Sequence, residues 1–292
     1  MSVKKILVKI FNGISGIFKK NTKVTVNVVK LSENELLKGR CAIITGATGG
    51  IGYSIADAML NAGATVVITG RTEERCKKAV EQLEIIDGSR KGRVFYQVMD
   101  VRQVDKFDES FVEIKTKVFP LKIDILCNNA GVQGARFGDA IEEEFDNVMD
   151  TNYKGVFFLS QLISKYMIDN GIKGNILNIA SVSSDRPTNG AYALSKACMK
   201  EMTLGLAKFL IPYNIVVNGI APGPTATPMM NKNESSSIYH QSNPSKRYAM
   251  PEEIGNMAVV LTSDMGRLVV GSLVYMGGGA GVITYDDCKY SI

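Results

Sequence analysis

Two side chains in the stretch AYALSKACMK, residues 191–200, have the chemistry of a tuned acid. Tyr192 carries a phenol, and Lys196, four residues later, carries an ammonium group. Residues four apart on a helix lie on the same face, so a helix here would place the two groups together. A free phenol has a pKa of about 10, and a neighbouring positive charge lowers it toward neutrality. The pair therefore predicts a proton donor and acceptor, provided that the surrounding chain builds a site around it.

Other catalytic chemistries find little support in the residue types. The one histidine, His240, lies in the polar stretch SSSIYHQSNPSK, where a solvated loop is expected, so a Ser-His-Asp triad is disfavoured. The five cysteines are odd in number, widely spaced and never in a Cys-x-x-Cys pattern. This usage favours reduced thiols, a cytoplasmic location and no metal site.

A glycine-rich turn upstream has the pattern of a dinucleotide site. In TGATGGIG, residues 45–52, Gly46 permits a tight turn, while Gly50 and Gly52 let the backbone approach a pyrophosphate. The turn follows an apolar run, and Ile51 begins an amphipathic stretch, so the phosphates would lie at the positive end of a helix.

Elements that could position these residues alternate along the chain. Short apolar runs are typical of parallel strands buried on both faces, and the stretches between them have helical periodicity. No linker separates a second domain. We predict an α/β fold with one doubly wound, Rossmann-like, parallel seven-stranded sheet covered by helices on both sides. The expected strands are 41–45, 64–70, 93–100, 123–129, 174–180, 214–221 and 272–278, and the expected helices are 51–62, 103–118, 141–169, 190–211 and 251–263.

The N-terminus differs in charge from the rest of the chain. The chain has 292 residues and a net charge of +5; residues 1–40 carry nine Lys and Arg against two Glu, a charge of +7, which leaves −2 for the remainder. We therefore expect no nucleic-acid partner for the main domain. Apolar residues recur at helical spacing between lysines over residues 4–20, which predicts a basic amphipathic helix in an extension spanning 1–36. This helix would pack on a protein surface or make peripheral contact with an anionic membrane.

The motifs, taken in order, resemble the short-chain dehydrogenase/reductase family from about Leu37 to Gly279, within a domain of residues 37–292. Residues 45–52 resemble its TGxxxGxG motif, 128–131 its NNAG motif, 192–196 its YxxxK motif and 222–227 its PG-x-x-x-T stretch. The resemblance implies an oxidoreductase that moves a hydride between a nicotinamide and a carbonyl or alcohol carbon. It assigns cofactor binding to Gly46, Thr48, Gly50, Ile51, Gly52, Arg71, Asp100, Val101, Asn128, Ala130, Gly131, Tyr192, Lys196, Pro222, Gly223, Thr225 and Thr227.

The same resemblance implies four catalytic residues. Tyr192 would supply or remove the proton, and Lys196 would tune it and grip the nicotinamide ribose. Ser181 would donate a hydrogen bond to the substrate oxygen, and Asn152 would hold a proton-relay water. Ser181 precedes Tyr192 by eleven positions, whereas a longer gap is more common in the family. A shortened loop is the simplest explanation, and it predicts a different pocket wall.

The end of the second strand bears on the cofactor. Relatives that prefer NAD carry an acid there for the ribose hydroxyl, but this chain has Gly70 followed by Arg71, which could pair with a 2′-phosphate. Gly49 stands where NADP-dependent relatives often have a second basic residue. We predict NADP as the preferred cofactor, with NAD as the alternative.

The substrate is a small-molecule carbonyl or alcohol whose identity the motifs leave open. The overall likeness is to beta-ketoacyl carrier-protein reductases and to related carbonyl and sugar dehydrogenases. A carrier-protein substrate would use basic residues at the pocket mouth, whereas a sugar or polyol would use hydrogen-bonding groups; a non-catalytic cofactor sensor or assembly protein is a third, weaker interpretation. The polar stretch 229–250, which begins with Met229 and Met230, predicts a lid, and relatives predict a homotetramer or dimer. The basic candidates are Arg136, Arg186, Lys246 and Arg247, and the hydrogen-bonding candidates are Gln133, Ser183 and Asn189.

Overall fold

A computed structural model describes residues 34–230, 232 and 237–284. Seven strands form one parallel sheet in the order β3-β2-β1-β4-β5-β6-β7, which confirms the predicted doubly wound sheet. The expected N-terminal helix over 4–20 lies outside the described residues, as do residues 285–292. The strands are Cys41–Ile44 (β1), Thr65–Gly70 (β2), Val94–Val98 (β3), Ile125–Asn128 (β4), Asn175–Ile179 (β5), Val216–Pro222 (β6) and Leu273–Met276 (β7).

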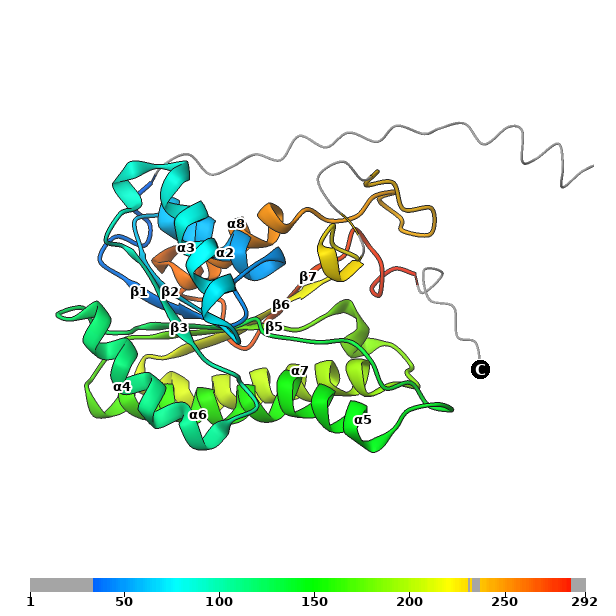
Figure 1. The fold of residues 1–292 in the computed structure, drawn as a ribbon. Helices are drawn as coiled ribbons and strands as arrows, with labels where there is room; N and C mark the ends of the chain where they lie inside the picture. The colour runs from blue at the N-terminus through cyan, green and yellow to red at the C-terminus, as the bar shows by residue number, and fades with distance from the viewer. Residues whose placement is uncertain (1–33, 231, 233–236, 285–292) are drawn as a thin grey trace, which may run out of the picture.

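Helices cover both faces of this sheet. Figure 1 shows α2, α3 and α8 on one face and α4, α5, α6 and α7 on the other. The two apolar clusters on either side of the central strands exclude water and hold the layers together. The helices are Gly50–Asn61 (α2), Glu73–Ile86 (α3), Phe107–Val118 (α4), Glu142–Met149 (α5), Gly155–Asp169 (α6), Ala191–Leu210 (α7) and Pro251–Thr262 (α8), and short helical segments include Asp150–Lys154 (η3) and Val182–Asp185 (η4).

Two helices differ from the sequence prediction. The helix α3 was not expected, because it is polar overall and only Cys76, Ala79 and Leu83 are buried. The single helix expected over 141–169 contains a turn of π-helix at η3, where the backbone N–H of Gly155 donates to the carbonyl of Asp150. Such insertions rotate the residues on either side relative to each other and often occur at functional sites.

The order of the strands locates a crevice. The chain leaves β1 toward β2 and β3, then returns to the other side of β1 to form β4. Ligands of doubly wound sheets bind where the strand order reverses, outside the carboxyl ends of the strands. The turns after β1 and β4 both end at this place.

Candidate active site

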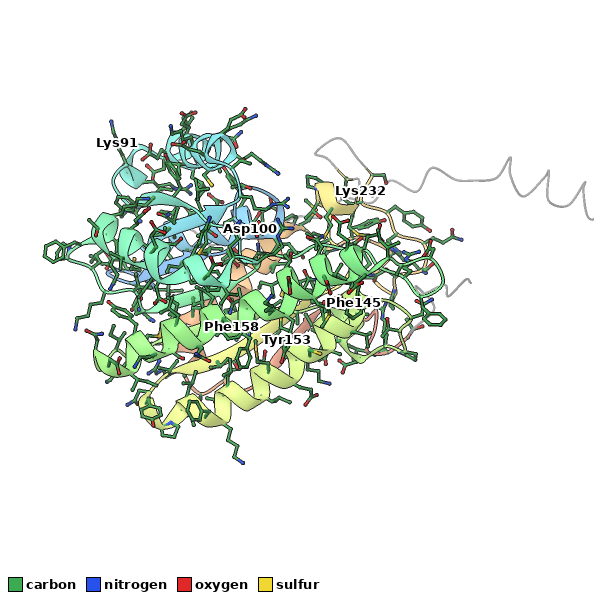
Figure 2. All side chains as sticks on the ribbon, turned by 60° about the horizontal axis from the view of Figure 1, so that its bottom comes forward. Lys91, Asp100, Phe145, Tyr153, Phe158 and Lys232 are labelled. Carbon is green, nitrogen blue, oxygen red and sulfur yellow. The ribbon has the colours of Figure 1, made fainter. Side chains whose placement is uncertain are left out.

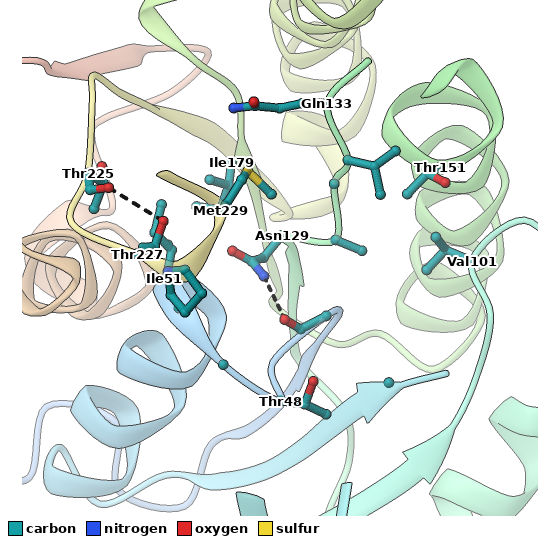
Figure 3. A pocket seen from close by; sticks show the side chains of 18 of the residues that line it. Thr48, Ile51, Val101, Asn129, Gln133, Thr151, Ile179, Thr225, Thr227 and Met229 are labelled. Atoms are coloured by element: carbon teal, nitrogen blue, oxygen red, sulfur yellow. Dashed lines mark hydrogen bonds between the residues drawn. The ribbon is translucent and has the colours of Figure 1, made fainter. Parts of the chain in front are cut away.

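A cavity of about 640 Å³ opens along the carboxyl ends of the strands. Its walls come from the turns after β1, β2, β4, β5 and β6 and from the start of α7 (Figure 3). This volume falls within the range of small-molecule and cofactor sites, about 300–1,000 Å³.

The turn between β1 and α2 leaves its backbone open to a ligand. Gly46 has φ +64°, and a Cβ on it would lie 2.8 Å from the Cα of Ala130. A Cβ on Gly52 would lie 2.4 Å from Nδ2 of Asn129 and 2.8 Å from the carbonyl oxygen of Gly46. Only glycine therefore fits at either position. The free N–H groups at the start of α2 are a favourable place for a phosphate.

Thr45 and Asn129 tie this turn to the end of β4. The Thr45 hydroxyl accepts hydrogen bonds from the backbone N–H groups of Asn129 and Ala130, each at 3.0 Å. Nδ2 of Asn129 donates to the carbonyl oxygens of Thr45 at 2.9 Å and Gly46 at 3.2 Å. Asn129 also lines the cavity, and it was not among the predicted site residues (Figure 3). Its place in the NNAG motif was the available signal.

The end of β2 has no room for an acidic side chain. A Cβ on Gly70 would lie 2.6 Å from Cγ2 of Thr48 and 3.0 Å from Sγ of Cys76. Arg71 and Arg75, both exposed, line the cavity beside it. Arg75 was missed at the sequence level, although it lies four residues after Arg71 on the first turn of α3.

Asp100 is already engaged by a third arginine. The guanidinium of Arg102 donates to Asp100 through Nε at 3.0 and 3.1 Å and through Nη2 at 2.6 Å, and Nη1 of Arg102 donates to Asn147 at 3.0 Å. The hydrogen bonds from Arg102 hold the pKa of Asp100 below its ordinary value. This end of the cavity is thus lined by Arg71, Arg75 and Arg102, and the charge of Asp100 is balanced by that of Arg102.

Three predicted site residues do not line the cavity. Gly52 packs beneath the glycine turn. Asn128 is buried, and its Nδ2 donates to Ser160 and Asn178, each at 2.9 Å. Asn152 is fully buried, and its side chain binds the backbone of Val132 at 2.8 and 2.9 Å and Ser195 at 3.1 Å. The Asn152 side chain thus holds the loop after β4.

Tyr192 and Ser181 meet in the cavity wall. Tyr192 lies at the start of α7 among Val132, Ala135 and Val148, and the nearby Ser181 side chain acts to lower the pKa of its phenol. The gap of eleven residues therefore leaves both residues in the lining of the same cavity. Ser181 is 6% exposed and also accepts a hydrogen bond from the N–H of Ser183 at 3.1 Å.

Lys196 lies behind the tyrosine and is 4% exposed. Its Nζ donates to the carbonyl of Ile179 at 2.8 Å and lies 5.9 Å from the centroid of the Tyr192 ring. Burial lowers the pKa of Lys196 from 10.5 to about 8, so the ammonium still dominates at neutral pH. A Cβ on Gly131 would lie 3.6 Å from this Nζ and 3.4 Å from Oδ1 of Asn152.

The pKa of Tyr192 moves in the direction opposite to our expectation. Burial raises the pKa of this phenol, and the nearby Ser181 side chain offsets only part of the rise. The expected fall required the ammonium to point at the phenol oxygen, but Lys196 binds the Ile179 carbonyl instead. At neutral pH the residue is therefore a neutral phenol, a proton donor.

The stretch after β6 forms another wall and the start of the expected lid. Pro222, Gly223, Thr225 and Thr227 line the cavity, with Met229 and Met230 beyond them. The N–H of Ala226 donates to the carbonyl of Ala249, and the N–H of Ala249 donates to that of Pro224, each at 2.8 Å. These bonds close the neck of the segment 226–249. Arg247 binds both carboxylate oxygens of Glu253 at 2.7 Å on α8.

The cavity gathers most of the residues predicted from the sequence. It adds the carboxyl end of β5, two further arginines and the loop after β4. Predicted residues in its lining are Gly46, Thr48, Gly50, Ile51, Arg71, Asp100, Val101, Ala130, Gly131, Ser181, Tyr192, Lys196, Pro222, Gly223, Thr225 and Thr227; unpredicted ones include Arg75, Met99, Arg102, Asn129, Val132 and Thr151.

Among the residues that the structure describes, no cluster of His, Cys, Asp and Glu could hold a metal ion. Within the same part of the chain, no helix is long and apolar enough to span a membrane.

Comparison with known proteins finds consistent relatives. Residues 40–237 match the family model described as short chain dehydrogenase. The chain is 33% identical over 250 residues to gluconate 5-dehydrogenase of Gluconobacter oxydans, covering 83% of this chain and 95% of that protein. It is 33% identical over 248 residues to 3-oxoacyl-(acyl-carrier-protein) reductase of Aquifex aeolicus, covering 83% and 98%. A solved gluconate 5-dehydrogenase from Burkholderia cenocepacia, in complex with NADP and tartrate, superposes with a TM-score of 0.74 at 30% identity, covering 84% of this chain and 97% of that one.

Proposed function

The chain belongs to the short-chain dehydrogenase family of oxidoreductases, which act on CH–OH and C=O groups, and from this premise we propose that it is an NADP-preferring enzyme with Tyr192 as its proton donor and acceptor. The observation that supports this proposal most is that Ser181, Tyr192 and Lys196 line one cavity, with Nζ of the buried Lys196 5.9 Å from the centroid of the Tyr192 ring.

The nicotinamide, when bound, supplies or accepts the hydride. In reduction, the neutral Tyr192 phenol donates its proton to the substrate oxygen, and Ser181 donates a hydrogen bond to the same oxygen as charge develops on it. The Lys196 ammonium stabilises the remaining phenolate once it turns from the Ile179 carbonyl toward the phenol oxygen. Asn152 orients the Val132 backbone, and a Cβ on Gly131 would lie 3.4 Å from its Oδ1 and 3.6 Å from Nζ of Lys196, so the two groups are near each other.

Phenylalanine at position 192 tests this role directly. Tyr192→Phe removes the proton but keeps the ring, so we expect kcat to fall by about 10²–10⁴-fold. The dissociation constant of the nucleotide, measured by fluorescence titration, should rise by no more than about tenfold, since a phenol hydrogen bond to the ribose is worth about 0.5–1.5 kcal/mol. Full activity in Tyr192→Phe would refute the proposed mechanism.

The preference for NADP is supported by the end of β2. An acid for the ribose hydroxyl has no space at Gly70, and Arg71, Arg75 and Arg102 give this wall a positive charge that suits a 2′-phosphate. We expect Arg71→Ala to weaken NADPH binding by about tenfold, the value of one charge-assisted hydrogen bond, and to leave NADH binding unchanged. Calorimetric titration of NADPH and NADH into wild type and Arg71→Ala measures the four dissociation constants. If both proteins bound NADH more tightly than NADPH, and to the same degree, the proposed preference for NADP would be wrong.

Two substrate classes fit the relatives, a 3-oxoacyl group on a carrier protein and a keto or hydroxy sugar acid. Of the four basic candidates for binding an acidic carrier protein, Arg247 is already bound to Glu253. Of the three hydrogen-bonding candidates, Gln133 lines the cavity, while Ser183 and Asn189 lie outside its described lining. We therefore favour a small hydroxylated substrate. A panel of acyl-carrier mimics and sugar acids, followed by NADPH absorbance, tests the choice; turnover of the acyl substrates alone would reverse it.

A homo-oligomer, tetramer or dimer, is supported by the exposed apolar face of α6 and α7. Phe157 and Phe158 are 41% and 39% exposed, and Phe209 is 64% exposed. Figure 2 shows Tyr153 and Phe158 on this face. Patches of this kind commonly mark interfaces. Light scattering at micromolar concentration should give a multiple of 31.7 kDa. A cytoplasmic location and a peripheral membrane contact through residues 4–20 remain predictions from the sequence.

A further inference from the structure

The short segment after Ser181 is fixed at its first residue. Ser181 caps η4: its Oγ accepts from the N–H of Ser183 at 3.1 Å, and its carbonyl accepts from the N–H of Ser184 at 3.0 Å. Any shift of η4 would therefore move the Ser181 hydroxyl with it, away from Tyr192.

Asp185, the last residue of η4, is held by two other elements. Its carboxylate accepts hydrogen bonds from Nζ of Lys200 on α7 and from the phenol of Tyr275 on β7. The side chains of Lys200 and Asp185 are 30% and 24% exposed, so water screens this pair only in part. Burial acts to raise the pKa of Asp185, but the bonds from Lys200 and Tyr275 outweigh it and lower that pKa.

The helix that holds Asp185 is the one that carries the candidate catalytic residues. Lys200 follows Lys196 by one helical turn and Tyr192 by two, so all three share one face of α7. On the other side, a Cβ on Gly277 would lie 2.7 Å from Cγ1 of Val182, and one on Gly281 would lie 2.9 Å from its Cβ. The segment η4 is therefore confined between α7 and the turn after β7.

We propose that Asp185 is a positioning residue that keeps Ser181 in register with Tyr192 by anchoring η4 to α7 through Lys200 and to β7 through Tyr275. This inference rests on the proposed function of Ser181 and Tyr192. Asp185 is absent from the cavity lining that the structure describes, so it acts through η4 and not on the substrate. The anchor compensates for the short connection, because only five residues, 186–190, join η4 to α7.

Activity and binding measurements on matched variants test the anchor. Asp185→Ala should lower kcat by about 10- to 100-fold, as expected for a displaced catalytic group, with the nucleotide dissociation constant within about twofold of wild type. Asp185→Asn keeps one acceptor oxygen, so its kcat should lie between those of wild type and Asp185→Ala. Lys200→Met and Tyr275→Phe each remove one anchor and should give smaller losses; they also serve if Asp185→Ala does not fold.

Asp124→Asn is the control. Asp124 forms an ion pair with Arg40, and the two side chains are 14% and 20% exposed, so the pair is at least as buried as that of Asp185 and Lys200. Asp124 precedes β4, at the end of the sheet opposite the cavity. Asp124→Asn should lower the melting temperature of the protein without lowering kcat. A kcat for Asp185→Ala that falls no further than that of Asp124→Asn, or a parallel loss of nucleotide affinity, would overturn the inference.

The pKa of Tyr192 gives a measurement that needs no turnover. The Ser181 side chain lowers this pKa, so its displacement in Asp185→Ala should raise it. Alcohol oxidation needs the phenolate as proton acceptor, so the rising limb of its pH profile should also move to higher pH. NMR of tyrosine labelled at Cζ, with Tyr192→Phe to assign the signal, reads the pKa directly. If wild type turns over no substrate but the pKa rises in Asp185→Ala, the proposed function fails and the anchor stands; an unchanged pKa refutes the anchor in either case.

Discussion

The buried Lys196 should make the stability of this protein rise with pH. Its ammonium is 4% exposed and has one hydrogen-bond acceptor in the structure, the Ile179 carbonyl. Burial of the charge lowers its pKa from 10.5 to about 8. In the unfolded chain the same side chain is hydrated and regains its ordinary pKa, so the two states release their protons over different ranges of pH.

The sign and the size of the effect follow from linkage. Between about pH 8 and pH 10.5 the native protein has released a proton that the unfolded chain still holds, so the free energy of unfolding increases with pH across this window. The full difference between the two pKa values corresponds to about 3 kcal/mol, of which about 2 kcal/mol is gained by about pH 9.5. Below about pH 8 the lysine is charged in both states, and the cost of its burial is present in full.

Comparison with Lys196→Met isolates this contribution, because methionine has a similar length and does not titrate. Urea unfolding of both proteins at about pH 7 and about pH 9.5 gives the change for each, and other titrating groups cancel in the difference. We expect wild type to gain about 2 kcal/mol relative to the variant between these values. A difference that does not change with pH would show that Lys196 keeps its ordinary pKa and would refute the reasoning.

Two further predictions concern the turn and the lid. Gly52→Ala places a Cβ 2.4 Å from Nδ2 of Asn129 and 2.8 Å from the Gly46 carbonyl, so we expect a loss of about 1–3 kcal/mol in unfolding free energy and weaker nucleotide binding by calorimetry. Gly49→Ala in the same turn, with nothing within 4 Å of its Cβ, is the stability control, and equal losses in both would contradict the steric argument. Glu253→Gln removes the charge that holds Arg247 at the base of the segment 226–249, so thermolysin should cleave this segment a few times faster, in keeping with about 0.5–1 kcal/mol for a pair whose side chains are 25% and 26% exposed. Lys77→Met, which breaks the exposed pair with Glu73, should leave the cleavage rate unchanged, and an unchanged rate in Glu253→Gln would refute the role of the pair.

The sequence by itself determined the fold and most of the cavity lining. Strands buried on both faces must be continuously apolar, and parallel strands need helical crossovers. The alternation of short apolar runs with helical stretches along the chain therefore predicted a doubly wound parallel sheet. Gly46 and Gly52 followed from the glycine pattern of the turn after the first strand, and the residues at the other strand ends followed from the resemblance to the short-chain dehydrogenase/reductase family. The carboxyl ends of parallel strands share one edge, which brings these positions together. The helix α3 escaped detection because its three buried residues gave too weak an apolar pattern.

The tertiary structure decided how the predicted residues are used. Asn128 and Asn152 come from matching motifs, yet their side chains face the interior, since their orientation depends on partners from other elements. Arg75 and Arg102 joined the cavity through the packing of α3 and the turn after β3, which local sequence does not encode. The spacing of Ser181 and Tyr192 left open whether they share one cavity until the fold brought β5 and α7 together. Likewise, the choice of Lys196 between the phenol and the Ile179 carbonyl depends on distances that arise only when the strand and the helix have packed.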